Sequence, residues 1–266
     1  MTFIDAEAEQ QEILIAYLSE AGYEGFEEKE KELKAFIVDK NYDPLLVKQL
    51  ADSYKLSYLE EQIPSQNWNE VWESNFQPVI VEDFVAIRAG FHPPIETVQH
   101  EIVITPKMSF GTGHHATTYM MMRQMRDIDF AGKSVFDFGT GTGVLAILSE
   151  KLGAAKVLAI DNDEWSIDNA SENIKRNNCS TIEINKAESA KGNNHFDVIL
   201  ANINKNVILD NLDNLASQLK PDGSLLLSGL LANDADEIIE SAGRLSFKLK
   251  HKETTDNWLL ISLSRN

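Results

Sequence analysis

The segment Ser134–Asp163, SVFDFGTGTGVLAILSEKLGAAKVLAIDND, carries the clearest structural signal in this chain. An apolar strand ends at Asp137, three alternating glycines follow, and an apolar helix begins at Val144. A second apolar strand then delivers Asp161 to its carboxyl end. From Phe130 onward, strand-like and helix-like patterns alternate at regular intervals. This order predicts a parallel α/β sheet with helices on both faces.

The loop between the first strand and its helix is suited to a polar ligand. Gly139, Gly141 and Gly143 let the backbone turn sharply and approach a ligand without interference from Cβ atoms. The amino end of the next helix offers free N–H groups to a carboxylate, and Asp161 can accept hydrogen bonds from both hydroxyls of a ribose. A nicotinamide-dependent oxidoreductase is disfavoured, because its G-x-G-x-x-G fingerprint needs a glycine where this chain has Val144.

The composition indicates a cytoplasmic protein. The 266 residues suffice for one large domain, or for a mid-sized domain and a small one. No stretch approaches the roughly 18 apolar residues of a membrane span, and the start, MTFIDAEAEQ, lacks the basic flank and apolar run of a signal peptide. Cys179 is the only cysteine, which excludes an internal disulfide and fits a reducing compartment.

The net charge of −18 bears on the partners of this protein. We find no run of lysine and arginine that could form the basic face with which proteins contact nucleic-acid phosphates, so we expect no direct binding of nucleic acid. Residues 1–60 hold 14 acidic and 6 basic side chains, a net charge of −8. This excess either serves solubility or forms a surface that attracts a basic partner.

Residues 1–60 are predicted to form a small α/β domain that leads with its helix. The helix covers residues 7–21, and two short strands, YEGFEEK and ELKAFIVD, follow it. A second helix runs from Pro44 to about Tyr54. The apolar face of the first helix comprises Ile13, Leu14, Tyr17 and Leu18.

Residues 61–80 are interpreted as a connector, in which Trp68 and Trp72 lie four apart on one helical face and pack between two domains. The remaining residues, 81–266, form the large domain. Its first part, residues 80–105, alternates like strands.

A second unusual segment, residues 105–118, reads TPKMSFGTGHHATT and precedes a methionine-rich helix. Its Gly-x-Gly is flanked by Phe110 and by threonines, which is typical either of a functional loop or of an ordinary turn and helix cap. His114 and His115 are adjacent, so in a helix or a strand they point apart and make poor joint metal ligands. We expect no metal site.

The glycine loop, D-x-G-x-G-x-G, resembles the first motif of the class I S-adenosylmethionine-dependent methyltransferases. The downstream elements agree: a strand followed by residues 185–188, a strand over 195–202 that ends in Asn202, and the turn and strand of 219–231. The stretch SFKLKHKETTDNWLLISLS reads as two closing antiparallel strands. The resemblance implies a Rossmann-like, mostly parallel sheet and S-adenosylmethionine as the cofactor.

Three motifs together, F-G-T-G-x-H-x-T-T, D-x-G-T-G-x-G and A-N-I, resemble the PrmA family of bacterial ribosomal-protein methyltransferases. That family trimethylates amines on protein eleven of the large ribosomal subunit. The resemblance implies a small recognition domain, a connector with paired tryptophans and a catalytic domain, with a basic ribosomal protein as the substrate. The family's recognition domain usually opens with a strand, which is almost missing before Glu7 here.

The same resemblance implies roles for individual residues at the reacting end of the site. Phe110 and Thr117 would lie near the methyl group and the incoming amine. Asn202 would line the methyl-transfer site, and both Asn202 and Thr118 would contact the cofactor.

Other roles concern the rest of the cofactor. Gly139 and Gly141 would pass under its methionine portion, and Asp161 would hold its ribose. Asp137 would orient the loop or the cofactor's amino group, and Glu188 would lie near the adenine.

The chemistry of the site favours nitrogen as the methyl acceptor. Methyl transfer from a sulfonium is an in-line displacement that needs a neutral, aligned nucleophile. Neutralising a lysine amine at pH 7 costs about 4–5 kcal/mol, and an α-amine only about 1. An adjacent carboxylate would stabilise the charged amine, and residues 201–204, Ala-Asn-Ile-Asn, contain none. The predicted acceptors are lysine side chains, the N-terminal α-amine, or both.

Two alternatives stay open. Enzymes that methylate nucleic-acid bases or glutamine amides typically carry Asn-Pro-Pro-Tyr, whereas residues 202–205 here are Asn-Ile-Asn-Lys, without a ring. The second alternative is a scaffold that binds the cofactor without catalysis, although each expected motif position is filled. For the oligomeric state, a monomer is the default expectation.

Overall fold

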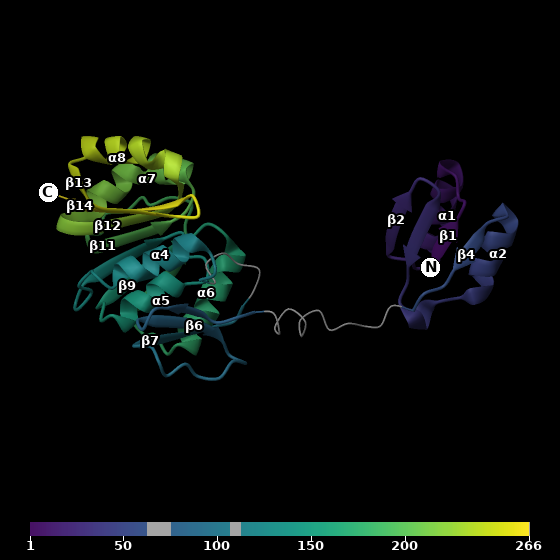
Figure 1. Ribbon diagram of the computed structural model, residues 1–266, viewed down its shortest axis with the longest axis horizontal. Coiled ribbons are helices and arrows are strands. Elements are labelled where there is room, and N and C mark those ends of the chain that lie inside the picture. Colours follow the sequence, from purple (N-terminus) through teal and green to yellow (C-terminus); the bar gives the residue numbers. More distant parts are fainter. Residues whose placement is uncertain (63–75, 107–112, 266) are drawn as a thin grey trace. The chain divides into compact units, whose positions relative to one another are not determined.

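The computed structural model describes residues 1–62, 76–106 and 113–265. The chain divides into two compact units, Met1–Val71 and Trp72–Asn266 (Figure 1). Trp68 and Trp72, which we interpreted as packing between domains, lie outside the described residues.

The first unit is a four-stranded antiparallel sheet with two helices. Its strand order is β2-β3-β1-β4. Its elements are β1 (Thr2–Ile4), α1 (Ala8–Glu20), β2 (Gly25–Lys29), β3 (Glu32–Phe36), α2 (Pro44–Tyr54) and β4 (Ser57–Leu59). Helix α2 begins where local chemistry favours it, because the Asp43 carboxylate accepts from the N–H groups of Leu45 and Leu46, and Pro44 occupies the first turn.

The prediction that this unit leads with its helix is wrong. Strand β1 precedes α1 and pairs with both β3 and β4, and its central residue Phe3 is fully buried. Three residues are too few to show an alternating pattern, so the strand is set by its tertiary partners.

The apolar face predicted for α1 is correct only in part. Leu14 and Leu18 are buried, but Tyr17 is 51% exposed. The buried side of the helix includes Gln11 instead, whose Nε2 donates to the carbonyls of Ala6 and Lys29.

The second unit contains a seven-stranded sheet of order β10-β9-β8-β11-β12-β14-β13. The strands are β8 (Ser134–Phe138), β9 (Lys156–Asp161), β10 (Ile182–Lys186), β11 (Phe196–Asn202), β12 (Leu219–Leu231), β13 (Phe247–Thr255) and β14 (Trp258–Arg265). The first five strands in this order pair in parallel, and β14 is antiparallel to both of its neighbours. The predicted mostly parallel α/β sheet with closing antiparallel strands is confirmed.

Helices cover both faces of this sheet (Figure 1). The helices are α4 (Ala116–Met125), α5 (Val144–Lys151), α6 (Glu164–Arg176), α7 (Lys205–Gln218) and α8 (Ala235–Arg244). Side chains of α4, α5 and α6 share one buried cluster with one face of the strands, and those of α7 and α8 share a second cluster with the other face. The central strands are therefore buried on both sides, which explains their nearly continuous apolar sequences.

The strand pattern predicted for residues 80–105 corresponds to a small second sheet. It consists of β5 (Val79–Val81), β6 (Val85–Ala89) and β7 (His100–Ile104), in that order. Strand β7 contacts α5 and α6, so this sheet lies beside the helices that follow the glycine loop, residues 139–143, and β9.

The edge strand β13 carries exposed Lys248, Lys250 and Lys252, a short basic run that our sequence interpretation passed over. Lysines are common on edge strands, because a charged row prevents pairing with another chain. Among the described residues, no helix has the length and apolar character needed to cross a membrane.

Candidate active site

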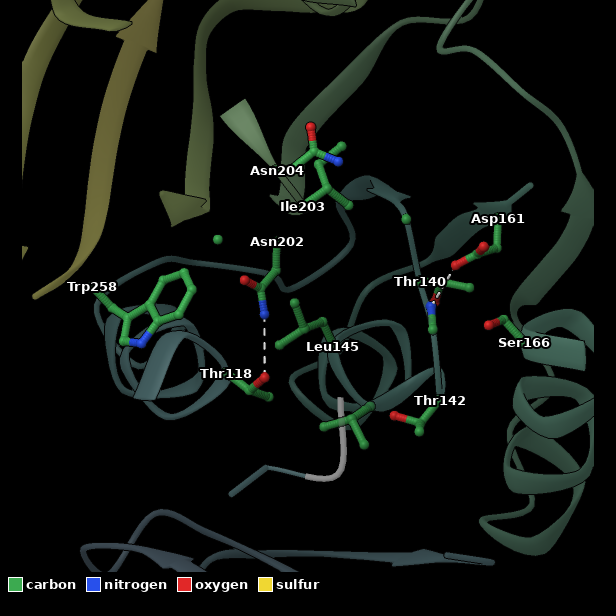
Figure 2. A pocket seen from close by; sticks show the side chains of 14 residues that line it. Thr118, Thr140, Thr142, Leu145, Asp161, Ser166, Asn202, Ile203, Asn204 and Trp258 are labelled. Atoms are coloured by element: carbon green, nitrogen blue, oxygen red, sulfur yellow. Dashed lines mark hydrogen bonds between the residues drawn. The ribbon is translucent and has the colours of Figure 1, made fainter. Parts of the chain in front are cut away.

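A cavity of about 390 Å³ opens where β8, β9 and β11 end at their carboxyl ends (Figure 2). It is lined by Thr118, Gly139, Thr140, Gly141, Thr142, Val144, Leu145, Asp161, Ser166, Asn202, Ile203, Asn204, Gly229 and Trp258. Open α/β sheets bind ligands at this edge, and the volume lies in the range of pockets for small organic ligands. The sequence motif and the cavity thus occur at the same place.

The glycine loop forms one wall of the cavity in a conformation that glycine favours. Gly139, Gly141 and Gly143 have φ angles of 78°, 55° and 80°. The N–H groups of Gly139 and Thr140 both donate to the carbonyl of Ile160, at 2.9 Å each, which ties the loop to the end of β9. A side chain at position 139 would place its Cβ 2.2 Å from Cγ2 of Ile203. The loop therefore needs glycine there for both conformation and space.

Asp161 lies at the end of β9 and lines the cavity. Its Oδ2 accepts from the N–H of Gly141 at 2.9 Å, and its Oδ1 accepts from the N–H of Asp163 at 3.1 Å. Two backbone donors leave further acceptor capacity on the carboxylate, since its two oxygens offer about four lone-pair positions. The remaining positions suit a pair of hydroxyl groups on a ligand.

Asp137 is buried beneath the loop and is not among the lining residues. The Thr140 hydroxyl donates to its Oδ2 at 2.6 Å, so the carboxyl group braces the loop from below. Burial, with a smaller contribution from the Asp161 charge, raises the pKa of Asp137 to about 7. Of the two roles considered for Asp137, this position favours orienting the loop.

Asn202 is the last residue of β11, and its amide has a defined direction. Its Nδ2 donates to Oγ1 of Thr118 at 3.2 Å, while its buried Oδ1 has no hydrogen-bond partner among the described residues. Figure 2 shows this oxygen on the side of the Trp258 ring. A buried acceptor without a partner costs about 1–3 kcal/mol, so it marks a point where a ligand donor is expected to arrive.

Besides Asp137, two predicted site residues that the structure describes, Thr117 and Glu188, do not line this cavity. Thr117 is buried, but its hydroxyl lies 2.8 Å from Nδ1 of His115, where it takes part in the cap of α4. Glu188 is exposed and does not line the cavity. Phe110 lies outside the described residues. The roles of these three residues remain predictions.

Trp258 and Gly229 line the cavity and were not found by sequence reasoning. Trp258 begins β14 and pairs with Leu231, and its ring makes an edge contact with the ring of His115, with centroids 4.4 Å apart. Gly229 has φ 78°, and a Cβ there would lie 2.4 Å from the carbonyl oxygen of Ile203. A glycine inside a strand is a usable signal of close backbone approach. For Trp258, no local sequence pattern predicts a place in the site.

Among the described residues, no group of three or more His, Cys, Asp or Glu side chains could hold a metal ion. His114 and His115 have separate partners: Nε2 of His114 lies 2.8 Å from the carbonyl of Gln77, and His115 contacts Thr117.

Comparisons with known proteins agree with this geometry. A family model described as ribosomal protein L11 methyltransferase (PrmA) matches residues 2–266. The ribosomal protein L11 methyltransferase of Porphyromonas gingivalis is 40% identical over 258 residues, which cover 94% of this chain and 89% of that protein. The ribosomal protein L11 methyltransferase of Chlorobaculum parvum is 36% identical over 265 residues, covering 93% and 90%.

Solved structures give the same picture. The crystal structure of the ribosomal protein L11 methylase from Lactobacillus delbrueckii subsp. bulgaricus matches with a TM-score of 0.67 and 30% identity, covering 71% of this chain and 99% of that chain. A methyltransferase from Pyrococcus furiosus matches with a TM-score of 0.53 and 21% identity, covering 61% and 88%. The latter likeness supports the fold alone.

Proposed function

The chain belongs to the ribosomal protein L11 methyltransferase (PrmA) family, and from this premise we propose that it transfers methyl groups from S-adenosylmethionine to amino groups of ribosomal protein L11. The acceptors are lysine side chains, the N-terminal α-amine, or both. The observation that carries the proposal is the buried Oδ1 of Asn202, which has no hydrogen-bond partner within residues 1–62, 76–106 and 113–265. An amine N–H is a donor that this oxygen can accept beside the glycine loop.

The residues of the cavity fit S-adenosylmethionine. The glycine loop offers a wall without side chains, which would lie along the methionine portion, and the free acceptor capacity of Asp161 suits the ribose hydroxyls. When bound, the cofactor supplies a methyl group on a positively charged sulfur. Asp137 acts indirectly, through its bond from Thr140, by holding the loop in place.

The other end of the cavity suits a neutral amine. The Nδ2 bond to Thr118 fixes the Asn202 amide, so that its oxygen can accept an N–H and direct the nitrogen lone pair. Asp161 is the only acid among the lining residues, and it lies across the cavity from Asn202 (Figure 2). In the part of the chain that the structure describes, no carboxylate lines the cavity beside Asn202, so the charged ammonium is not favoured there. The Trp258 ring shields this end and can contact a methylated ammonium product through its π face.

Asp161→Ala is expected to weaken S-adenosylmethionine binding by about 1–3 kcal/mol, because ribose hydroxyls would lose their acceptor. Isothermal titration calorimetry measures the change. Asp168→Ala removes the same charge from an exposed position on α6 and serves as the control. Unchanged affinity for Asp161→Ala would contradict the ribose assignment.

We assign substrate recognition to residues 1–60, with residues 61–80 as a connector and residues 81–266 as the catalytic domain. The net charge of −8 over residues 1–60 supports this assignment, since ribosomal proteins that bind RNA are basic and opposite charges accelerate encounter.

Salt is therefore expected to slow capture of ribosomal protein L11 by about tenfold between low and high ionic strength. Stopped-flow association with the full chain measures this rate. Neutralising exposed Glu27, Glu28 and Glu30 to glutamine should lower the rate at low salt roughly threefold. Neutralising exposed Asp210 and Asp213 to asparagine should change it less. An association rate that changes neither with salt nor on neutralising Glu27, Glu28 and Glu30 would contradict the electrostatic role.

We place the reaction in the cytoplasm, where ribosomal proteins are made, and the lone Cys179 is compatible with that reducing compartment. The expectations of a monomer and of no direct binding to nucleic acid remain predictions. The proposed function is tested by mass spectrometry of ribosomal protein L11 and of ribosomal RNA, each incubated with the chain and isotope-labelled S-adenosylmethionine. Labelled amines on the protein support the proposal, whereas label only on RNA, or on neither, overturns it.

A further inference from the structure

Asn173, on α6, is fully buried and joins two segments that are far apart in the sequence. Its Nδ2 donates to the carbonyl oxygen of Thr142 at 2.9 Å. Its Oδ1 accepts from the N–H of Thr105 at 2.8 Å. One planar amide thus holds a carbonyl of the cofactor loop and an N–H just beyond the end of β7.

Both partners of Asn173 belong to segments that contribute residues to the cavity or lead to them. Thr142 lines the cavity, and the peptide group that follows it is held at both ends, because the N–H of Gly143 donates to the carbonyl of Thr140 at 2.9 Å. Thr105 is the first residue of the T-P-K-M-S-F-G-T-G-H-H segment that leads to the cap of α4. The amide therefore links the loop under the cofactor to the start of the segment that precedes Thr118.

Asn177, one helical turn later, provides a natural comparison. Its Oδ1 accepts from the N–H of Val103 at 2.9 Å, and its Nδ2 donates to the carbonyl of Val103 at 2.7 Å. Asn177, the residue that follows α6, therefore attaches β7 to the end of this helix by the same chemistry that Asn173 uses for Thr105. No hydrogen bond described for its side chain reaches the cofactor loop.

We propose that Asn173 is a positioning residue for S-adenosylmethionine, which sets the glycine loop through the Thr142 carbonyl. This inference rests on the proposed function, since it assumes that the loop holds the cofactor. A buried hydrogen bond holds its donor and acceptor in one position, because neither group can bond to water instead when the two move apart. Asn173 does not itself line the cavity, so its effect on the cofactor passes through Thr142.

Two matched substitutions test this inference, Asn173→Leu and Asn177→Leu. Leucine has nearly the shape of asparagine, so each change removes two hydrogen bonds to the β7 region or the loop without adding charge. Calorimetry gives the Kd for S-adenosylmethionine, steady-state kinetics give KM and kcat, and thermal unfolding of the ligand-free chain reports the structural cost.

Both variants are expected to lower the unfolding temperature, but only Asn173→Leu should raise the Kd and KM for the cofactor, by about tenfold, with kcat at saturation falling less. Asn177→Leu should stay within about twofold of the parent Kd. If Asn173→Leu does not fold, Asn173→Asp replaces it, because a carboxylate still accepts from the Thr105 N–H but cannot donate to the Thr142 carbonyl.

Equal Kd values for the Asn173 variant and the parent, or equal shifts in the Asn173 and Asn177 variants, would overturn the positioning role. A parent chain that shows no heat of binding at all would overturn the proposed function, which makes the two failures distinguishable.

Discussion

Replacing Asn202 with alanine is expected to lower kcat for methyl transfer about a hundredfold or more, while the Kd for S-adenosylmethionine changes less than about threefold. The loss follows from the geometry, because Oδ1 of Asn202 is the buried acceptor available to align an incoming amine. Removing one oriented polar group from a reaction centre commonly costs about 10²–10³ in rate. Single-turnover methylation of ribosomal protein L11 gives the rate, and calorimetry gives the affinity.

Asn202→Asp is a more specific test than Asn202→Ala, because it keeps the size of the side chain and replaces the amide by a carboxylate. A carboxylate beside the amine favours the ammonium form and raises its pKa. The rate at pH 7 should therefore fall, and the pH–rate profile should move to higher pH by about one unit or more. A parent-like profile would contradict the requirement for a neutral amine. A scaffold without catalysis would show no rate to lose in either variant.

Gly139→Ala is expected to weaken S-adenosylmethionine binding about a hundredfold, which corresponds to about 2.7 kcal/mol. The new Cβ would lie 2.2 Å from Cγ2 of Ile203, so the loop or the start of the segment after β11 must move. A non-glycine residue at φ 78° adds a further cost of about 1–2 kcal/mol to folding. Calorimetry and thermal unfolding separate the two effects.

Gly132→Ala is the matched control, because Gly132 has φ 69° and no atom within 4 Å of the Cβ position. It should lose stability and keep its cofactor affinity. The double variant Gly139→Ala with Ile203→Ala removes the obstructing methyl group and should regain roughly tenfold in affinity, the behaviour expected of two residues in contact. No recovery would show that the clash with Ile203 is not the cause.

The parts of the site that follow directly from a strand end could be predicted from the sequence. Asp161 and Asn202 each terminate an apolar strand, and parallel strands place their carboxyl ends at one edge of a sheet. The glycine loop is also local, because its spacing and the helix after it are contiguous in the chain. The parallel direction of the central strands followed from the alternation of strands and helices, whereas the order of the strands in the sheet was not predicted.

The other features of the site and fold depend on three-dimensional geometry that a short sequence pattern does not determine. Thr117 and Thr118 are neighbours in sequence, but successive residues on a helix point about 100° apart, so only Thr118 lines the cavity. Trp258 reaches the site through an antiparallel ladder whose register depends on β12. Strand β1 is too short for periodicity, and its place between β3 and β4 is a matter of long-range pairing.

The most direct test of the account is a crystal structure of the chain with S-adenosylhomocysteine, the demethylated product. We expect its ribose hydroxyls on the Asp161 carboxylate and its amino-acid portion along the loop from Gly139 to Gly143. Its sulfur should face the end of the cavity that holds Asn202 and Trp258. Product bound at another surface, or a cavity closed by its own side chains, would contradict the account.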